Sequence, residues 1–123
     1  MSASDRAIEI VERAAQAASG KLASDPVAFD VSERLAITDA FLIVTAANDR
    51  QVGAVVEAVE EALAAAGIRP VRREGEREQR WVLLDYLDAV VHVQQPEERT
   101  LYALERLWKD CPPIDVAVDG ARR

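Results

Sequence analysis

Residues 80–93 read Arg-Trp-Val-Leu-Leu-Asp-Tyr-Leu-Asp-Ala-Val-Val-His-Val, and this stretch decides the fold. It holds two apolar runs, each shorter than a typical helix, on either side of an acidic Asp-Tyr-Leu-Asp segment. Runs this rich in Val and Leu are typical of strands that are covered on both faces. The stretch therefore predicts a β-hairpin. The turn type stays open, because Asp88-Ala89 replaces the Asn-Gly or Asp-Gly of a tight turn.

The chain has 123 residues, of which 50% are hydrophobic, so it can form one domain with its own core. We expect a single α/β domain over residues 1–112 and a flexible C-terminal tail over residues 113–123, where apolar residues are sparse. The single cysteine excludes an intramolecular disulfide and a multi-cysteine zinc site. With no apolar run of membrane-spanning length and no signal-peptide pattern, these features predict a soluble cytoplasmic protein.

The formal net charge of −7 disfavours direct, sequence-independent binding to nucleic acid, because Lys and Arg supply most of that affinity. A basic protein partner is favoured instead. The alternative is that this modest acidity only keeps the protein soluble.

Before the hairpin, the pattern predicts a helix over residues 3–19, with Ser2 and Asp5 at capping-box spacing. Its apolar face is rich in alanine, so we expect it to pack loosely on the sheet or to serve in a partner interface. Strands are predicted over residues 27–31 and 40–46. The second strand is continuously apolar from Phe41 to Val44, which favours a central place in the sheet.

Asn48, with Gln51 three residues later, predicts the start of a second helix that ends at Gly67. Its apolar stripe consists of Val52, Val55, Val56, Val59, Leu63 and Ala66. A third strand over residues 68–71 would then form a parallel pair with the second strand. Residues 72–80 are charged and predict a mobile loop.

After the hairpin, Pro96 begins a predicted helix that reaches Lys109, with Leu101, Leu104, Leu107 and Trp108 as its stripe. The elements thus follow the order α-β-β-α-β-β-β-α. This order predicts an α/β fold with a mixed sheet of about five strands and covering helices.

Few residues could carry catalysis. His92 lies in an apolar run without a local nucleophile or carboxylate, so a structural or interface role is favoured, and Cys111 lacks the helix N-terminal setting of a reactive thiolate. Four aspartates, Asp30, Asp39, Asp85 and Asp88, fall near predicted strand ends and leave open a metal-dependent phosphoryl-transfer site. However, the chain has no Walker loop, no Gly-x-Gly-x-x-Gly and no nucleotidyltransferase Gly-Ser motif. We therefore expect no catalytic residue, metal or cofactor.

Trp81 is either a large core residue of its strand or an anchor for a binding partner, because Trp buries much area at little entropic cost. Alternation in the strand sends Trp81, Leu83 and Asp85 to one face and Val82, Leu84 and Tyr86 to the other. An apolar patch beside carboxylates suits a partner that presents Lys and Arg around an apolar centre.

Six short motifs resemble those of the ribosomal silencing factor family, also called the Iojap family. The resemblance extends from about Ser24 to Pro112, in order and with compatible spacing. The motifs are Ile37-Thr38-Asp39-Ala40-Phe41, Asn48-Asp49-Arg50-Gln51-Val52, Glu74-Gly75, Trp81-Val82-Leu83-Leu84-Asp85-Tyr86, Val91-His92-Val93 and Leu104-Glu105-Arg106-Leu107-Trp108-Lys109-Asp110.

The resemblance implies a fold related to nucleotidyltransferases but without the catalytic motif, in a protein that is not an enzyme. It implies that the chain binds the large ribosomal subunit through ribosomal protein L-fourteen, blocks association with the small subunit and so represses translation under nutrient limitation. Family members are commonly dimeric when free. Organellar relatives act in ribosome assembly, so a role as a large-subunit assembly factor is the alternative.

Carried over by position, the family motifs imply a set of partner-binding residues and a second set that is either interface or structural. The sequence departs from the family pattern in two places: Leu87 stands where Gly usually follows the Tyr, and Gln94-Gln95 stand where an aromatic often follows Val-His-Val. The partner-binding set is Trp81, Val82, Leu83, Leu84, Asp85, Tyr86 and Asp88, and the second set is Arg50, Gln51 and His92.

Overall fold

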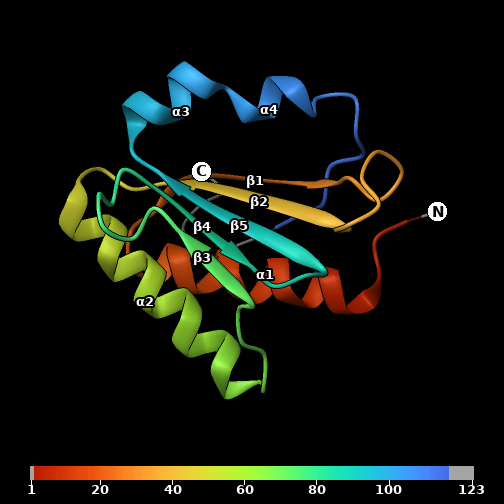
Figure 1. Ribbon diagram of the computed structural model, residues 1–123, viewed down its shortest axis with the longest axis horizontal. Coiled ribbons are helices and arrows are strands. Elements are labelled where there is room, and N and C mark those ends of the chain that lie inside the picture. Colours follow the sequence, from red (N-terminus) through yellow and green to blue (C-terminus); the bar gives the residue numbers. More distant parts are fainter. Residues whose placement is uncertain (1, 117–123) are drawn as a thin grey trace.

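The computed structural model describes residues 2–116, which form a five-stranded sheet between two layers of helices (Figure 1). Helices α1 (Asp5–Gly20) and α2 (Asp49–Ala65) cover one face, and the short helices α3 (Pro96–Tyr102) and α4 (Leu104–Leu107) lie over the other. No helix within residues 2–116 combines the length and apolar content that crossing a membrane requires. The strands are β1 (Ser24–Asp30), β2 (Ala40–Thr45), β3 (Arg72–Glu74), β4 (Trp81–Asp85) and β5 (Ala89–Gln94).

The strands are arranged in the order β1-β2-β5-β4-β3. Strands β2 and β5 are parallel and every other neighbouring pair is antiparallel, so the predicted mixed sheet of five strands is confirmed. The predicted hairpin is confirmed as β4 and β5, with Leu83 opposite His92. β5 lies in the middle of the sheet and is buried along its whole length, which explains why its sequence is apolar almost throughout.

The prediction of a third strand at residues 68–71 was wrong. Gly67 follows α2 with φ +79°, and the Ile68 N–H donates to the Leu63 carbonyl at 2.9 Å. This is the hydrogen bond of a Schellman motif, in which an apolar residue after the glycine packs back on the helix. The strand begins only at Arg72, within the predicted loop, and pairs with β4. β2 and β3 are therefore not a parallel pair, because β5 and β4 lie between them.

Helix α1 packs tightly, contrary to the loose contact expected from its alanine-rich face. Its inward side chains are almost fully buried, because small side chains let the helix approach the sheet and α2 closely. The helix cap also differs: Ser4 is the N-cap, and its Oγ accepts the Ala7 N–H at 3.1 Å. The buried residues of α1 are Ala7, Ile10, Val11, Ala14, Ala15 and Ala18.

Helix α2 begins as predicted. The Asn48 side chain accepts the Gln51 N–H at 2.9 Å, and Val52, Val55 and Val59 are fully buried. This cap fixes where the helix starts at the end of β2, and the valine stripe fixes which side faces α1 and the sheet.

The single C-terminal helix predicted up to Lys109 is broken. Ala103 adopts a left-handed conformation (φ 45°, ψ 52°) and separates α3 from α4. Neither helix contains a buried residue, and Leu101 and Leu107 from the predicted apolar stripe are 72% and 64% exposed. The break turns the two halves relative to each other, so the stripe does not form one face toward the sheet.

The chain after α4 returns to the sheet along β1. Phe29 forms a bridge with Pro113, and the Ile114 N–H donates to the Ala28 carbonyl at 2.9 Å. Residues 113 and 114 are therefore docked, in contrast to the flexible tail predicted from position 113. The remainder of that tail, residues 117–123, lies outside the described residues.

Candidate partner-binding surface

The face of the sheet beneath α3 and α4, called here the outer face, carries four of the site residues that the sequence singled out: Trp81, Leu83, Asp85 and His92. Strand alternation places on it one side chain in two from each of β2, β4 and β5. In the register, Ile43, His92 and Leu83 form one row across the three strands, and Thr45, Gln94 and Trp81 form the next. The predicted separation of Trp81, Leu83 and Asp85 from Val82, Leu84 and Tyr86 is thus confirmed.

Trp81 is half-buried on the outer face and makes two contacts that fix its ring. Its indole Nε1 donates to His92 Nδ1 at 3.1 Å, and its ring packs against Tyr102 of α3 with the centroids 4.8 Å apart. The backbone at the start of β4 is also packed closely against Gly75 (φ +83°). A Cβ at this position would lie 2.0 Å from the Trp81 carbonyl oxygen, so only glycine fits there. Trp81 is therefore part of the fold and remains partly exposed.

His92 is buried in the centre of the outer face, 5% exposed. Burial lowers the pKa of its imidazole to about 4, so the ring is neutral at physiological pH. Because Nδ1 accepts a hydrogen bond from the Trp81 indole N–H, the proton of the neutral ring resides on Nε2, which has no hydrogen-bond partner among the described residues. Phe41 packs edge-on against the imidazole with the centroids 5.1 Å apart.

Three residues of the proposed contact set belong to the core instead. Val82, Leu84 and Tyr86 are at most 4% exposed and pack toward α1 and α2. Burial also raises the pKa of the Tyr86 phenol. As they lie on the inner face, they can support a contact surface from behind but cannot touch a partner in this conformation.

The turn between β4 and β5 is held by its own polar groups. Asp85 Oδ1 accepts the Leu87 N–H at 2.9 Å, while its Oδ2 lies 3.6 Å from an Arg72 guanidinium nitrogen. Leu87 has φ +70°, a left-handed conformation, and is 58% exposed. Asp88 pairs with Arg6 at 3.3 Å, with both side chains partly exposed. The two aspartates thus remain near the surface, although each already has an intramolecular partner.

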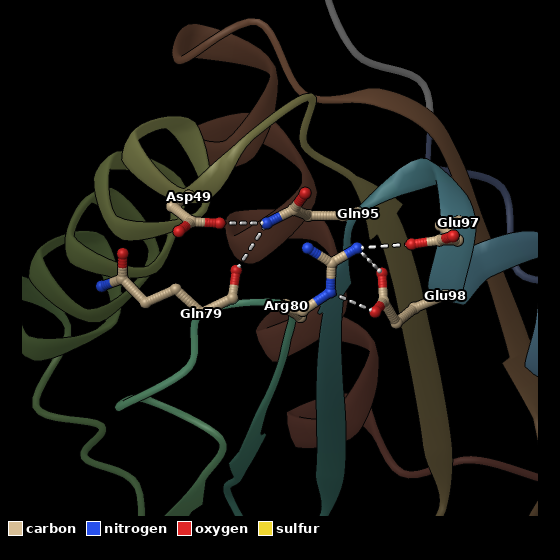
Figure 2. Close-up of polar contacts among 6 residues, drawn as sticks. All are labelled: Asp49, Gln79, Arg80, Gln95, Glu97 and Glu98. Atoms are coloured by element: carbon tan, nitrogen blue, oxygen red, sulfur yellow. Dashed lines mark hydrogen bonds and ion pairs between the residues drawn. The ribbon is translucent and has the colours of Figure 1, made fainter.

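Polar contacts close the opposite end of the hairpin (Figure 2). Arg80, just before β4, donates to Glu97 at 2.7 Å and also to Glu98, both at the start of α3. The hydrogen bond from Arg80 lowers the pKa of Glu98. Beside it, the Gln95 side-chain amide donates to Asp49 of α2 at 2.6 Å and to the Gln79 carbonyl at 3.0 Å. These contacts fix where α3 begins above the outer face.

Arg50 and Gln51 lie at the start of α2, away from the outer face. Arg50 is exposed, whereas Gln51 has a structural role: its side chain donates to the Lys21 carbonyl at 3.0 Å and accepts the Ala47 N–H. Gln51 therefore ties the start of α2 to the turn after α1.

The aspartates considered for metal binding have structural partners. Asp30 accepts the Ala3 N–H at 2.7 Å and the Ser32 hydroxyl at 2.6 Å, and Asp39 accepts the Ser4 N–H at 2.9 Å. Burial alone would raise the pKa of Asp30, but these hydrogen bonds to it lower the pKa overall. Within residues 2–116 no three His, Cys, Asp or Glu side chains are grouped so that they could hold a metal ion.

Sequence reasoning missed three residues that shape this surface. Tyr102 packs on Trp81, Arg80 binds both glutamates of α3, and Arg99 donates to Thr45 Oγ1 at 2.8 Å and to the Asp25 carbonyl at 2.9 Å. Each contact joins segments far apart in the chain, so no local pattern indicates it. The alternating charges around Arg80 and Arg99 look like an ordinary solvated surface.

Comparison with known proteins agrees with the motifs on this surface. The family model described as "Ribosomal silencing factor during starvation" matches residues 4–123. The chain belongs to the ribosomal silencing factor family. Ribosomal silencing factor RsfS of Bacillus subtilis is 39% identical over 107 residues, covering 87% of this chain and 91% of that protein. The chloroplastic protein Iojap of Zea mays is 29% identical and is covered over 47% of its length.

Solved structures support the same family fold. A crystal structure of a protein from Chromobacterium violaceum superposes with a TM-score of 0.81 at 33% identity, covering 84% of this chain and 86% of that one. A crystal structure of a protein from Bacillus halodurans superposes with a TM-score of 0.76 at 34% identity, covering 87% of this chain and 97% of that one. This chain therefore shares its fold with both of these proteins.

Proposed function

We propose that this protein is a translation repressor that binds the large ribosomal subunit through ribosomal protein L-fourteen and sterically blocks association with the small subunit. Translation would then fall when nutrients are limiting. The action is non-enzymatic and needs only affinity and position. Membership of the ribosomal silencing factor family supports this proposal, and so does the naming of the bacterial relatives as ribosomal silencing factors.

The observation that carries the proposal is the set of side chains that follow one another along the outer face of β4, here called the β4 row: Trp81, Leu83 and Asp85. All three side chains are partly exposed, and they combine aromatic, aliphatic and acidic groups along one strand. At the end of the β4 row, Leu87 and Val71 are 58% and 59% exposed, and the Val71 N–H donates to the Asp85 carbonyl. An apolar row with acidic neighbours fits a basic protein, as does the net charge of −7.

Truncation of Trp81 tests the contact. Trp81→Ala is expected to weaken binding to purified large subunits by about 2 kcal/mol or more, because large aromatic side chains at an interface centre carry much of the affinity. Co-sedimentation over a range of protein concentrations measures the loss. Leu22→Ala, which removes an 82% exposed apolar side chain elsewhere, is the matched control and should bind normally. Normal binding by folded Trp81→Ala would remove Trp81 from the contact.

A subunit-joining assay separates silencing from the alternative role in large-subunit assembly. We expect a dose-dependent loss of joined ribosomes when purified protein is added to large subunits before small ones. Tight binding with normal joining would instead favour an assembly factor that uses the same surface.

The proposal includes a cytoplasmic location and little direct contact with RNA, with a homodimer as a possible state of the free protein. A surface that binds a partner through apolar groups can also bind a second copy. Light scattering over a concentration series, with and without the ribosomal protein, checks whether dimer and complex compete.

A further inference from the structure

Five rings form a continuous chain on the outer face. Trp108 packs edge-on against Phe41 at 5.3 Å between centroids, Phe41 against His92 at 5.1 Å, His92 against Trp81 at 6.0 Å and Trp81 against Tyr102 at 4.8 Å. His92 lies at the middle of this chain and contacts Trp81 through both its ring and its Nδ1 atom. It is therefore the buried neighbour that can set the direction of the Trp81 indole.

His92 brings two polar nitrogen atoms into a buried position, which a residue that only fills space does not need. An imidazole that is 5% exposed, and whose Nε2–H has no partner among the described residues, leaves a buried polar group unsatisfied, which ordinarily costs stability. A phenyl ring would fill similar space without that cost. A phenyl ring, however, has no hydrogen-bond acceptor in place of Nδ1, the atom of His92 that accepts the Trp81 N–H.

We propose that His92 is a positioning residue for ribosome binding, whose Nδ1 accepts the Trp81 indole N–H and fixes the ring in its binding orientation. This inference rests on the proposed function, because it acts through Trp81 as the anchor. A preorganised anchor loses less side-chain freedom on binding, so the hydrogen bond increases affinity without touching the partner.

The tautomer can be read directly, because His92 is the only histidine in the chain. Nitrogen NMR spectra of the full chain at neutral pH are expected to show a protonated Nε2 and an unprotonated Nδ1. His92→Phe should shift the indole N–H resonance of Trp81 and leave that of Trp108 unchanged, since the hydrogen bond joins only the first to His92. A protonated Nδ1 would overturn the proposal.

Binding to purified large subunits tests the role. His92→Phe is expected to weaken binding by about threefold to tenfold, the effect of one neutral hydrogen bond. His92→Asn, which keeps an acceptor near the Nδ1 position, should restore part of the lost affinity. Thr38→Val is the matched control, since Thr38 is also buried and its hydroxyl has no partner within residues 2–116, but it lies outside the chain of rings.

A double-mutant cycle separates this inference from the proposed function. Trp81→Phe removes the indole donor, so adding His92→Phe to it should weaken binding no further. If Trp81→Phe weakens binding while folded His92→Phe binds normally, the positioning role is overturned and the contact surface stands. If Trp81→Phe itself binds normally, the indole N–H does not contribute to binding and the role of His92 is overturned, while Trp81→Ala decides whether the Trp81 contact stands.

Discussion

Leu87 combines an unusual backbone conformation with a departure from the family motif described above. Leu87 occupies the hairpin turn with φ +70°, a region that favours glycine because a Cβ clashes with the backbone there. The family resemblance implied glycine at this position, and the left-handed conformation is one that glycine adopts without strain. The turn keeps its geometry with leucine, because Asp85 Oδ1 holds the Leu87 N–H.

Leu87→Gly is expected to raise the free energy of unfolding by about 1 kcal/mol, because glycine adopts the left-handed conformation without strain. The leucine side chain is 58% exposed, so its removal costs little burial. Urea denaturation measures the change. Ile37→Gly is the control: Ile37 is 82% exposed but is not among the residues with positive φ, so glycine should lower stability there. Equal losses in both variants would contradict the argument.

At the scale of elements, local signals succeeded where they did not depend on distant partners. The Asn48 cap and the valine stripe predicted α2, and two runs rich in Val and Leu predicted the hairpin. Ile68 was misassigned to a strand because its burial comes from a Schellman motif, whose apolar residue looks the same in sequence as a strand residue. The prediction of one C-terminal helix from its apolar stripe was wrong, because Ala103 breaks the helix. Helical periodicity in the sequence does not indicate such a break.

Arg99 is the side chain that ties α3 to the sheet. Its guanidinium is mostly buried and contacts Glu105, Thr45 Oγ1 and the Asp25 carbonyl, which belong to α4, β2 and β1. Because neither α3 nor α4 contains a buried residue, these polar contacts, together with the Arg80 ion pairs and the ring contact of Tyr102, hold the helices in place of a buried apolar face. The position of Tyr102 over Trp81 thus depends on them.

Arg99→Ala is expected to lower the free energy of unfolding by about 2 kcal/mol, since charge-assisted hydrogen bonds to partly buried groups are lost. Hydrogen exchange should also become faster at the amides of α3. Arg106→Ala, an exposed arginine in α4, serves as the control and should change neither quantity appreciably. Unchanged exchange in Arg99→Ala would show that other contacts hold α3.

For the whole molecule, composition and order of elements were enough to predict a mixed α/β sheet, but not which candidate site residues face outward. Alternation correctly separated Trp81 from Val82, yet it could not identify which face was the core. The core face is the one against which α1 packs closely, and the alanine-rich sequence of α1 had predicted only a loose contact. The family motif from Trp81 to Tyr86 alternates between the two faces of the sheet. Val82, Leu84 and Tyr86 therefore belong to the core, and Trp81, Leu83 and Asp85 remain partly exposed.

The buried neutral His92 gives the whole fold a dependence on pH. In the unfolded chain the imidazole binds a proton below about pH 6.5, whereas in the folded protein it does so only below about pH 4. The unfolded state therefore binds more protons between these values, and stability falls as pH is lowered through this window. We expect a loss of about 2 kcal/mol between about pH 7 and pH 5, measured by urea denaturation.

His92→Phe is the matched control for this loss and should remove most of it. The lowered pKa values of Asp30 and Glu98 also make stability fall with acid, but only as pH drops below their unfolded pKa values of 3.8 and 4.5. The decline above about pH 5 therefore reports on the histidine. An unchanged pH profile in His92→Phe would mean that the imidazole does not stay neutral in the folded protein, and the Trp81 hydrogen bond would then lose its acceptor.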